Sequence, residues 1–138
     1  MTDDAPADLG DLLMRAARTL RRRWRDVLAH WDLSPHHARA LGVVTRRDGV
    51  RLTDLAERLR IAPRSATEVA DGLQGRGLVE RSPDPGDRRA VLLRATAEGR
   101  RVHGEIAAAR KADSAELYAR LSEADRVTLA RILRSLAD

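Results

Sequence analysis

The spacing of apolar residues along the chain predicts a mainly helical protein. Between residues 9 and 31, apolar side chains recur every three or four positions, which places them on one face of a long helix. Ser34 followed by Pro35 is typical of a helix start, and this helix is expected to run to about Arg47. Thr53 is expected to cap a short helix through residue 59, and another helix is expected over 63–77.

The pattern changes after residue 77. Residues 78–81 and 90–94 have the composition of strands, and the segment 82–87 between them is rich in turn-forming residues. These segments predict a hairpin with a long polar tip. A helical pattern returns at Thr96, and the capping-box pattern of residues 122–125 predicts the start of a last helix.

Composition narrows the class of protein. The chain contains no cysteine, which excludes disulfides, thiolate metal sites and thiol redox switches. Phenylalanine is absent as well, so leucine, valine, isoleucine and alanine must fill the core, as helical proteins allow. No apolar run reaches the about 18 residues of a membrane span, and the acidic first residues lack the layout of a signal peptide. We therefore expect a cytoplasmic protein that does not interact with membranes.

Two short helices with a tight connection, followed at once by a hairpin, are the pattern of a winged helix-turn-helix. The second helix, about residues 63–76, is expected to enter the major groove of DNA. Arg64 could donate two hydrogen bonds to guanine, while Ser65 and Thr67 could bind bases or phosphates, and Glu68 could accept from cytosine. The alternative is an ordinary solvated helix face. The other side of this helix is expected to pack on the core through Ala66, Val69, Ala70 and Leu73.

The hairpin tip, residues 82–89, is the expected wing. Arg88 and Arg89 suit the narrow, electronegative minor groove, although a solvated turn would look similar. The net charge of +5 is compatible with a nucleic-acid partner. It is not concentrated here, however, because residues 48–95 hold nine arginines against eight acidic residues.

Four segments together resemble the MarR family of bacterial regulators. They are residues 52–59, residues 66–81, the Asp-Arg-Arg run at 87–89 and the Thr-Ala-Glu-Gly run at 96–99. The resemblance implies a triangular helical homodimer in which Arg89 enters the minor groove and Asp87 holds the conformation of the wing. Members often carry a polar cap where this chain has Ala62 and a basic residue where it has Glu68, so we expect a different operator preference.

The resemblance also divides the chain, which is expected to form one MarR-like domain over residues 1–138. Residues 8–47 and 96–138 would supply dimerisation helices around a winged helix-turn-helix lobe at about 48–95. The apolar stripes of the first and last helices are too long for this lobe to cover, which favours a two-fold dimer. Packing of the terminal helices on each other within one chain is the alternative. A dimer predicts a pseudo-palindromic site on double-stranded DNA.

A small-molecule pocket between the dimerisation helices and the lobe is a further implication, often for anionic aromatic compounds. Trp24, His36, His37 and Arg39 are the candidate lining residues. Trp24 lies on an apolar stripe, so a place in the core is the competing interpretation, and the two histidines could simply be exposed. No metal and no cofactor are expected.

The sequence thus predicts a DNA-binding transcriptional regulator, a repressor that a small ligand releases. A winged-helix module that binds proteins instead of specific DNA is the alternative, and the acidic Glu68 and Asp71 favour it. An enzyme is not expected, because a cysteine nucleophile, a glycine-rich phosphate loop, metal-ligand spacing and a Ser/His/acid constellation are all missing.

Overall fold

The computed structural model describes residues 8–137. The acidic first residues, on which the expectation about a signal peptide rests, lie outside this range. The described elements, in chain order, are α1 (Leu9–Ala29), α2 (Pro35–Thr45), β1 (Val50–Arg51), α3 (Leu52–Leu59), α4 (Pro63–Gly75), β2 (Val79–Asp84), β3 (Asp87–Ala95), α5 (Ala97–Tyr118) and α6 (Glu123–Ala137).

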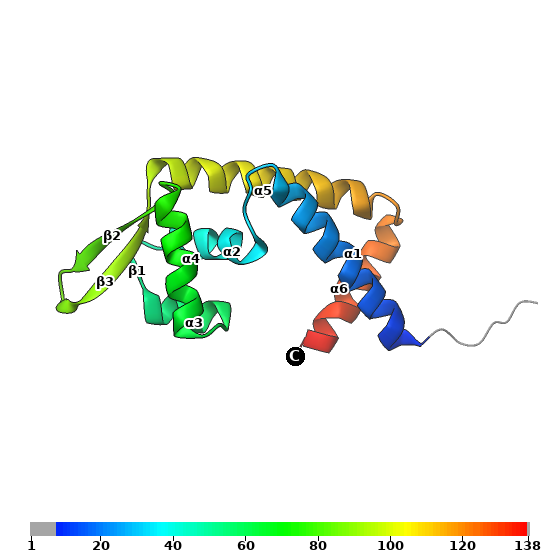
Figure 1. Ribbon diagram of the computed structural model, residues 1–138. Coiled ribbons are helices and arrows are strands. Elements are labelled where there is room, and N and C mark those ends of the chain that lie inside the picture. The colour runs from blue at the N-terminus through cyan, green and yellow to red at the C-terminus, as the bar shows by residue number, and fades with distance from the viewer. Residues whose placement is uncertain (1–7, 138) are drawn as a thin grey trace, which may run out of the picture.

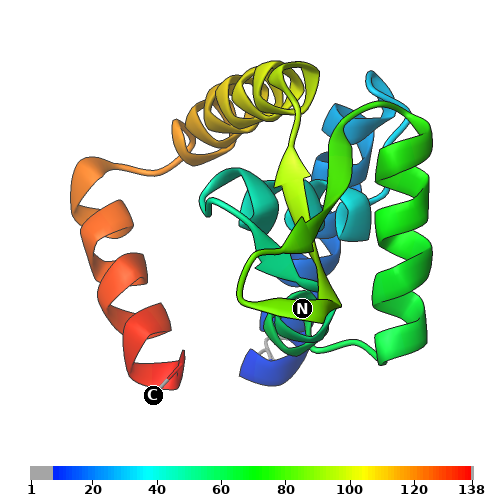
Figure 2. The same ribbon diagram turned by 90° about the vertical axis from the view of Figure 1, so that its left-hand side faces the viewer.

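The long helix α5 connects two parts of the molecule (Figure 1). Near its N-terminal end lies a lobe that contains α2, α3, α4 and the β-hairpin. Helices α1 and α6 lie towards its other end, and Figure 2 shows α6 standing apart from the rest of the chain. The predicted fold class, mainly helical with a small winged sheet, is confirmed.

The three strands form one antiparallel sheet in the order β1-β3-β2. The hairpin strands are longer than predicted, and the expectation of a long loop over 82–87 is wrong. Ser82 and Pro83 pair with Leu92 and Val91, so that only Pro85 and Gly86 remain between the strands. Pro83 is tolerated in β2 because β2 lies at the edge of the sheet, where a missing N–H is least costly. The strand register is also irregular between Pro83 and Asp84.

Helix boundaries also differ from the sequence prediction. Helix α1 ends at Ala29 and not at Trp31, because the chain turns through Asp32 in a left-handed conformation (φ 52°). Thr53 is not a cap: α3 begins at Leu52, after Arg51, without any side-chain capping bond. Helix α4 ends at Gly75, two residues early, and Gly77 then adopts a φ of 72° that suits glycine.

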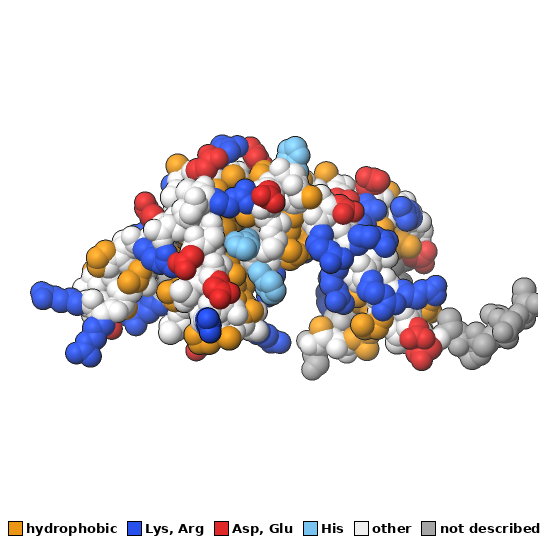
Figure 3. All heavy atoms as spheres, in the orientation of Figure 1, with side chains coloured by type: hydrophobic (Ala, Val, Ile, Leu, Met, Phe, Trp, Pro, Cys, Tyr) orange, Lys and Arg blue, Asp and Glu red, His pale blue; other side chains and the backbone are white. Residues whose placement is uncertain are grey.

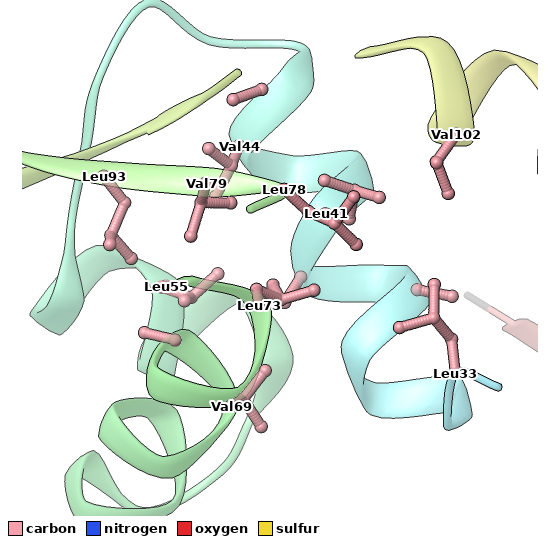
Figure 4. Packing of buried hydrophobic residues seen from close by; sticks show 14 of the residues in the cluster. Leu33, Leu41, Val44, Leu55, Val69, Leu73, Leu78, Val79, Leu93 and Val102 are labelled. Atoms are coloured by element: carbon pink, nitrogen blue, oxygen red, sulfur yellow. The ribbon is translucent and has the colours of Figure 1, made fainter. Parts of the chain in front are cut away.

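The hydrophobic core lies mainly inside the lobe and extends to Val102 and Ile106 of α5 (Figure 4). Leu41 and Val44 of α2 pack with Leu55 of α3, Leu73 of α4 and Leu93 of β3, and all five are essentially inaccessible to solvent. The predicted buried face of α4 is confirmed, since its apolar residues at 66, 69, 70 and 73 are the buried ones. The core therefore fixes which face of α4 points to solvent.

The terminal helices leave much apolar surface uncovered. Helix α6 has no buried residue, and α1 buries only Leu28. Leu9 is 81% exposed and Leu136 is 67% exposed. Helix α1 is held on α5 by the salt bridge from Arg23 to Asp113 (2.8 Å). Helix α6 makes no comparable contact with the rest of residues 8–137. These exposed stripes are the ones for which the sequence predicted a partner.

Candidate nucleic-acid interface

The solvent face of α4 carries the residues predicted to contact DNA. Arg64 is 94% exposed and Glu68 is 71% exposed, and their side chains form only a loose ion pair (3.9 Å). Thr67 is exposed, but its hydroxyl donates to the carbonyl of Pro63 (3.1 Å) within the helix. Ser65 is half-buried at the edge of this face. The N-terminal turn of α4 thus presents a polar surface that is free to meet a ligand.

The start of α4 lacks a side-chain cap. Ala62 occupies the N-cap position and Pro63 the first helical position, so the N-terminal backbone N–H groups have no side-chain acceptor there. Such groups, together with the helix dipole, favour an anion such as a DNA phosphate. Because Ala62 stands where family members often have a polar cap, the backbone N–H groups at the start of α4 stay available as donors at the expected interface.

The wing projects away from the lobe and ends in a tight turn (Figure 1). Arg88 and Arg89 are both exposed at the start of β3, directly after this turn. The carboxylate of Asp87 accepts a hydrogen bond from the backbone N–H of Arg89 (3.0 Å). This bond restricts the backbone that carries the two arginines.

A second carboxylate holds the wing tip, and sequence reasoning missed it. Asp84 accepts from the backbone N–H of Gly86 (2.9 Å) across the turn. It also accepts from the Nε (3.0 Å) and Nη2 (2.6 Å) of Arg51 in β1. The Gly86 N–H, and then the Arg51 guanidinium, lower the pKa of the Asp84 carboxyl. An Asp directly before Pro-Gly is a turn signal that could have identified the first of these bonds.

An ion pair also joins the hairpin to α4. Arg81 of β2 donates to the carboxylate of Asp71 (2.6 Å) and to the amide oxygen of Gln74. Asp71 is exposed, and its charge is partly compensated by this contact. The orientation of the wing relative to α4 is thus set by polar contacts as well as by the core.

The other end of α4 contacts the turn between α1 and α2. Arg76 donates to the carbonyl of Trp31 (2.5 Å) and to that of Asp32. Next to it, Gly72 leaves room for the imidazole of His37, because a Cβ at Gly72 would lie 2.6 Å from its Nε2. Burial, and then the charge of Arg76, lower the pKa of His37.

The four residues predicted to bind a small molecule do not share one site. Trp24 and Arg39 line a cavity of about 680 Å³ between α1, α2, α3 and α5. His36 and His37 line a smaller cavity of about 300 Å³ next to Ser65 of α4. Trp24 also packs against the core, as its place on an apolar stripe led us to expect.

Acidic and basic side chains are mixed over the lobe, and basic side chains gather over α1 (Figure 3). The polar face of α1 carries a row of exposed arginines at positions 15, 18, 21, 22 and 25. Within residues 8–137, no helix is long and apolar enough to cross a membrane. In the same range, no three histidine or acidic side chains gather as metal ligands would.

Comparison with known proteins identifies the fold. The model of the MarR family matches residues 31–90. The HTH-type transcriptional repressor MdtR of Bacillus subtilis is 30% identical over 105 residues, which is 76% of this chain and 68% of that protein. A MarR family protein from Bacillus stearothermophilus superposes with a TM-score of 0.82 and 26% identity, over 99% of this chain and 96% of the other.

A second solved structure is similar over the same extent. CouR from Rhodococcus jostii RHA1, solved with bound p-coumaroyl-CoA, has a TM-score of 0.78 and 26% identity over 99% of this chain and 96% of its own. Sequence, fold and helix-turn-helix geometry therefore agree. The chain belongs to the MarR family, whose members are transcriptional regulators and not enzymes.

Proposed function

We propose that the protein is a homodimeric repressor that binds a pseudo-palindromic DNA operator and is released by a small molecule. The exposed N-terminal turn of α4 carries the proposal, because Arg64 and Glu68 face solvent beside uncapped backbone N–H groups. This turn and the wing tip lie on the same lower side of the molecule in Figure 1. Helix α4 would enter the major groove and the wing the minor groove.

The dimer is part of the proposal. A second copy of this chain would cover the exposed apolar surface of α1 and α6 most simply, since isologous interfaces are the commonest kind in homo-oligomers. In this arrangement residues 8–47 and 96–138 form the dimer scaffold and residues 48–95 the DNA-binding lobe, with α2 packed against both. A DNA partner also places the protein in the cytoplasm.

Repression and release by a ligand have separate support. MdtR is named a repressor, and CouR was solved with an acyl-CoA ligand. In this chain, the cavity lined by Trp24 and Arg39 touches α3 of the lobe as well as α1 and α5 of the scaffold. A ligand there would contact both parts at once, which is a requirement for changing their relative position.

The test is binding to DNA from upstream of the protein's own gene, against a scrambled duplex, by fluorescence anisotropy over a salt series. We expect nanomolar affinity, about 10³-fold tighter than for the scrambled duplex. Arg89→Ala should weaken binding and reduce the salt slope by about 2 units, because a dimer carries two copies and each phosphate contributes about 0.9.

Arg18→Ala is the matched control, since it removes an exposed arginine of α1 far from the wing. Equal effects of the two variants would contradict the wing assignment. Weak, equal binding to both duplexes with little salt dependence would instead favour the protein-interaction module, which the acidic Asp71 and Glu68 keep as the second candidate.

A further inference from the structure

Three polar side chains are exposed in the first two turns of α4, those of Arg64, Thr67 and Glu68. The hydroxyl of Thr67 donates to the carbonyl of Pro63, so its hydrogen is already used and only its oxygen lone pairs remain for another partner. Glu68 is a carboxylate, which can only accept. Arg64 is therefore the one available donor among these three side chains, and the other two offer acceptors beside it.

Arg64 and Glu68 lie close together without forming a hydrogen bond. Nε of Arg64 is 3.9 Å from Oε1 of Glu68, and the two side chains are 94% and 71% exposed. Asp71, the other carboxylate of α4, is instead bound by Arg81 (2.6 Å). Arg64 and Glu68 thus keep their hydrogen-bonding groups for a partner that offers acceptors to the guanidinium and a donor to the carboxylate.

The phosphate backbone of DNA does not meet both needs. A phosphate has only acceptors and a negative charge, so it would bind Arg64 but repel Glu68. A G·C pair differs, because its major-groove edge presents the acceptors N7 and O6 of guanine beside the amino group N4 of cytosine. O6 and N4 are hydrogen-bonded to each other in the base pair and lie about 3 Å apart. The donors of Arg64 and the acceptors of Glu68 are similarly close in this structure.

An A·T pair presents its groups in another order. Its major-groove edge offers the acceptor N7, then the amino group N6 of adenine, and then the acceptor O4 of thymine. Side by side on this edge, Arg64 would face the adenine amino group or Glu68 would face the thymine oxygen, and either places like groups against each other. Of the two kinds of base pair, G·C is the one that satisfies the arginine and the carboxylate together.

We infer that Arg64 and Glu68 read one G·C pair together in each operator half-site, and that a methyl group on N4 of its cytosine weakens operator binding. One N4 hydrogen pairs with guanine and the other faces the major groove, where N4-methylcytosine carries its methyl group. Glu68 would then lose its donor, while guanine stays available to Arg64. Glu68 stands where members of the family often carry a basic residue, which could not accept from an amino group. The inference rests on the proposed function, with α4 in the major groove.

The first measurement identifies the base pair. Wild-type protein, Glu68→Gln and Arg64→Gln each select duplexes from a random pool, and the bound duplexes are sequenced. We expect a G·C pair at one position of each half-site for the wild type. Glu68→Gln should accept A·T at this position, because an amide can donate to O4 as well as accept, and Arg64→Gln should relax the same position. Glu57→Gln is the matched control, since it makes the same change on an exposed residue of α3, and it should leave the consensus unchanged.

The second measurement places N4-methylcytosine at this position of the selected duplex. Fluorescence anisotropy should show that the wild type binds the methylated duplex at least about tenfold more weakly, as expected when a base contact is lost in each half-site. Glu68→Ala should bind the methylated and unmethylated duplexes equally, because it has no acceptor to lose a donor. 5-Methylcytosine keeps both N4 hydrogens, and the wild type should bind it more tightly than N4-methylcytosine.

The outcomes separate this inference from the proposed function. Equal losses for the wild type and Glu68→Ala on the methylated duplex would mean that the methyl group only obstructs the groove, which overturns the inference. Changes at different positions for Glu68→Gln and Arg64→Gln would overturn the joint reading of one pair. A consensus that is the same for the wild type and Glu68→Gln contradicts the inference alone. No enriched sequence in any selection would contradict the proposed function, and the inference with it.

Discussion

Gly99→Ala is expected to destabilise the protein strongly, although alanine favours a helix. Gly99 lies in the first turn of α5, directly over the backbone that precedes β2. A Cβ added there would lie 1.9 Å from the carbonyl oxygen of Leu78, and Cβ atoms essentially never approach closer than 3.0 Å. That oxygen also accepts the hydrogen bond from the backbone N–H of Thr96 (3.1 Å). Helix α5 and the base of the hairpin must therefore separate by about 1.1 Å, which breaks this bond.

The size of the effect follows from these contacts. Overpacking of a close contact costs about 1–3 kcal/mol, and the lost hydrogen bond about 1 kcal/mol more. The gain in helix propensity offsets about 1 kcal/mol. We expect the free energy of unfolding to fall by about 2 kcal/mol or somewhat more.

Urea unfolding followed by circular dichroism measures this change, at one fixed protein concentration because a dimer unfolds in a concentration-dependent way. Gly104→Ala is the matched control in the same helix, since nothing lies within 4 Å of a Cβ at that position. It should stabilise the protein by about 0.5–1 kcal/mol. If Gly99→Ala unfolds at the same urea concentration as the wild type, the close approach to Leu78 does not constrain the fold.

Three further outcomes can be measured. Burial lowers the pKa of His37 and of His103 from 6.5, so the unfolded chain takes up protons first as the pH falls. The free energy of unfolding should be constant above about pH 7 and decrease below pH 6.5, and urea titrations of His103→Gln should show a smaller decrease. Asp84→Asn weakens the contact with Arg51 and should reduce operator affinity severalfold in anisotropy assays. The loss of stability should be small, because Arg51 is 45% exposed and water can replace the contact, although Asp84 itself is only 12% exposed. Arg76→Ala should speed amide hydrogen exchange in the last turn of α4, and unchanged exchange would mean that its contacts with the α1–α2 turn contribute nothing.

The parts of the fold that depend on local periodicity could be predicted from the sequence. The buried face of α4 follows from the spacing of residues 66–73, because helix geometry alone decides which side chains share a face. The length of the two wing strands could not be predicted from the sequence in the same way. Pro83 and Pro85 indicate a loop locally, yet β2 lies at the sheet edge, where a missing N–H is tolerated.

The parts of the site that depend on tertiary contacts could not be predicted. Arg51 and Asp84 are far apart along the chain and meet only because β1 joins the sheet beside β3. Likewise, His36 and His37 lie within three residues of Arg39 in the sequence, but their side chains face a different cavity from that of Trp24 and Arg39. A residue list from sequence can therefore name charged candidates without grouping them into sites.

The turn between α1 and α2 has an influence on α4 that its sequence does not suggest. The carbonyls of Trp31 and Asp32 accept from Arg76 at the end of α4, and the Trp31 indole donates to Glu105 of α5 (3.1 Å). Hydrogen bonds weaken steeply when their geometry changes, whereas apolar side chains keep much of their contact when they slide. Because this turn bonds to both helices, α4 cannot shift against α5 without carrying the turn along or breaking these bonds. On the proposed function, ligand-driven movement of the lobe must work against this turn, and loss of the Arg76 contacts should make the protein easier to release from DNA.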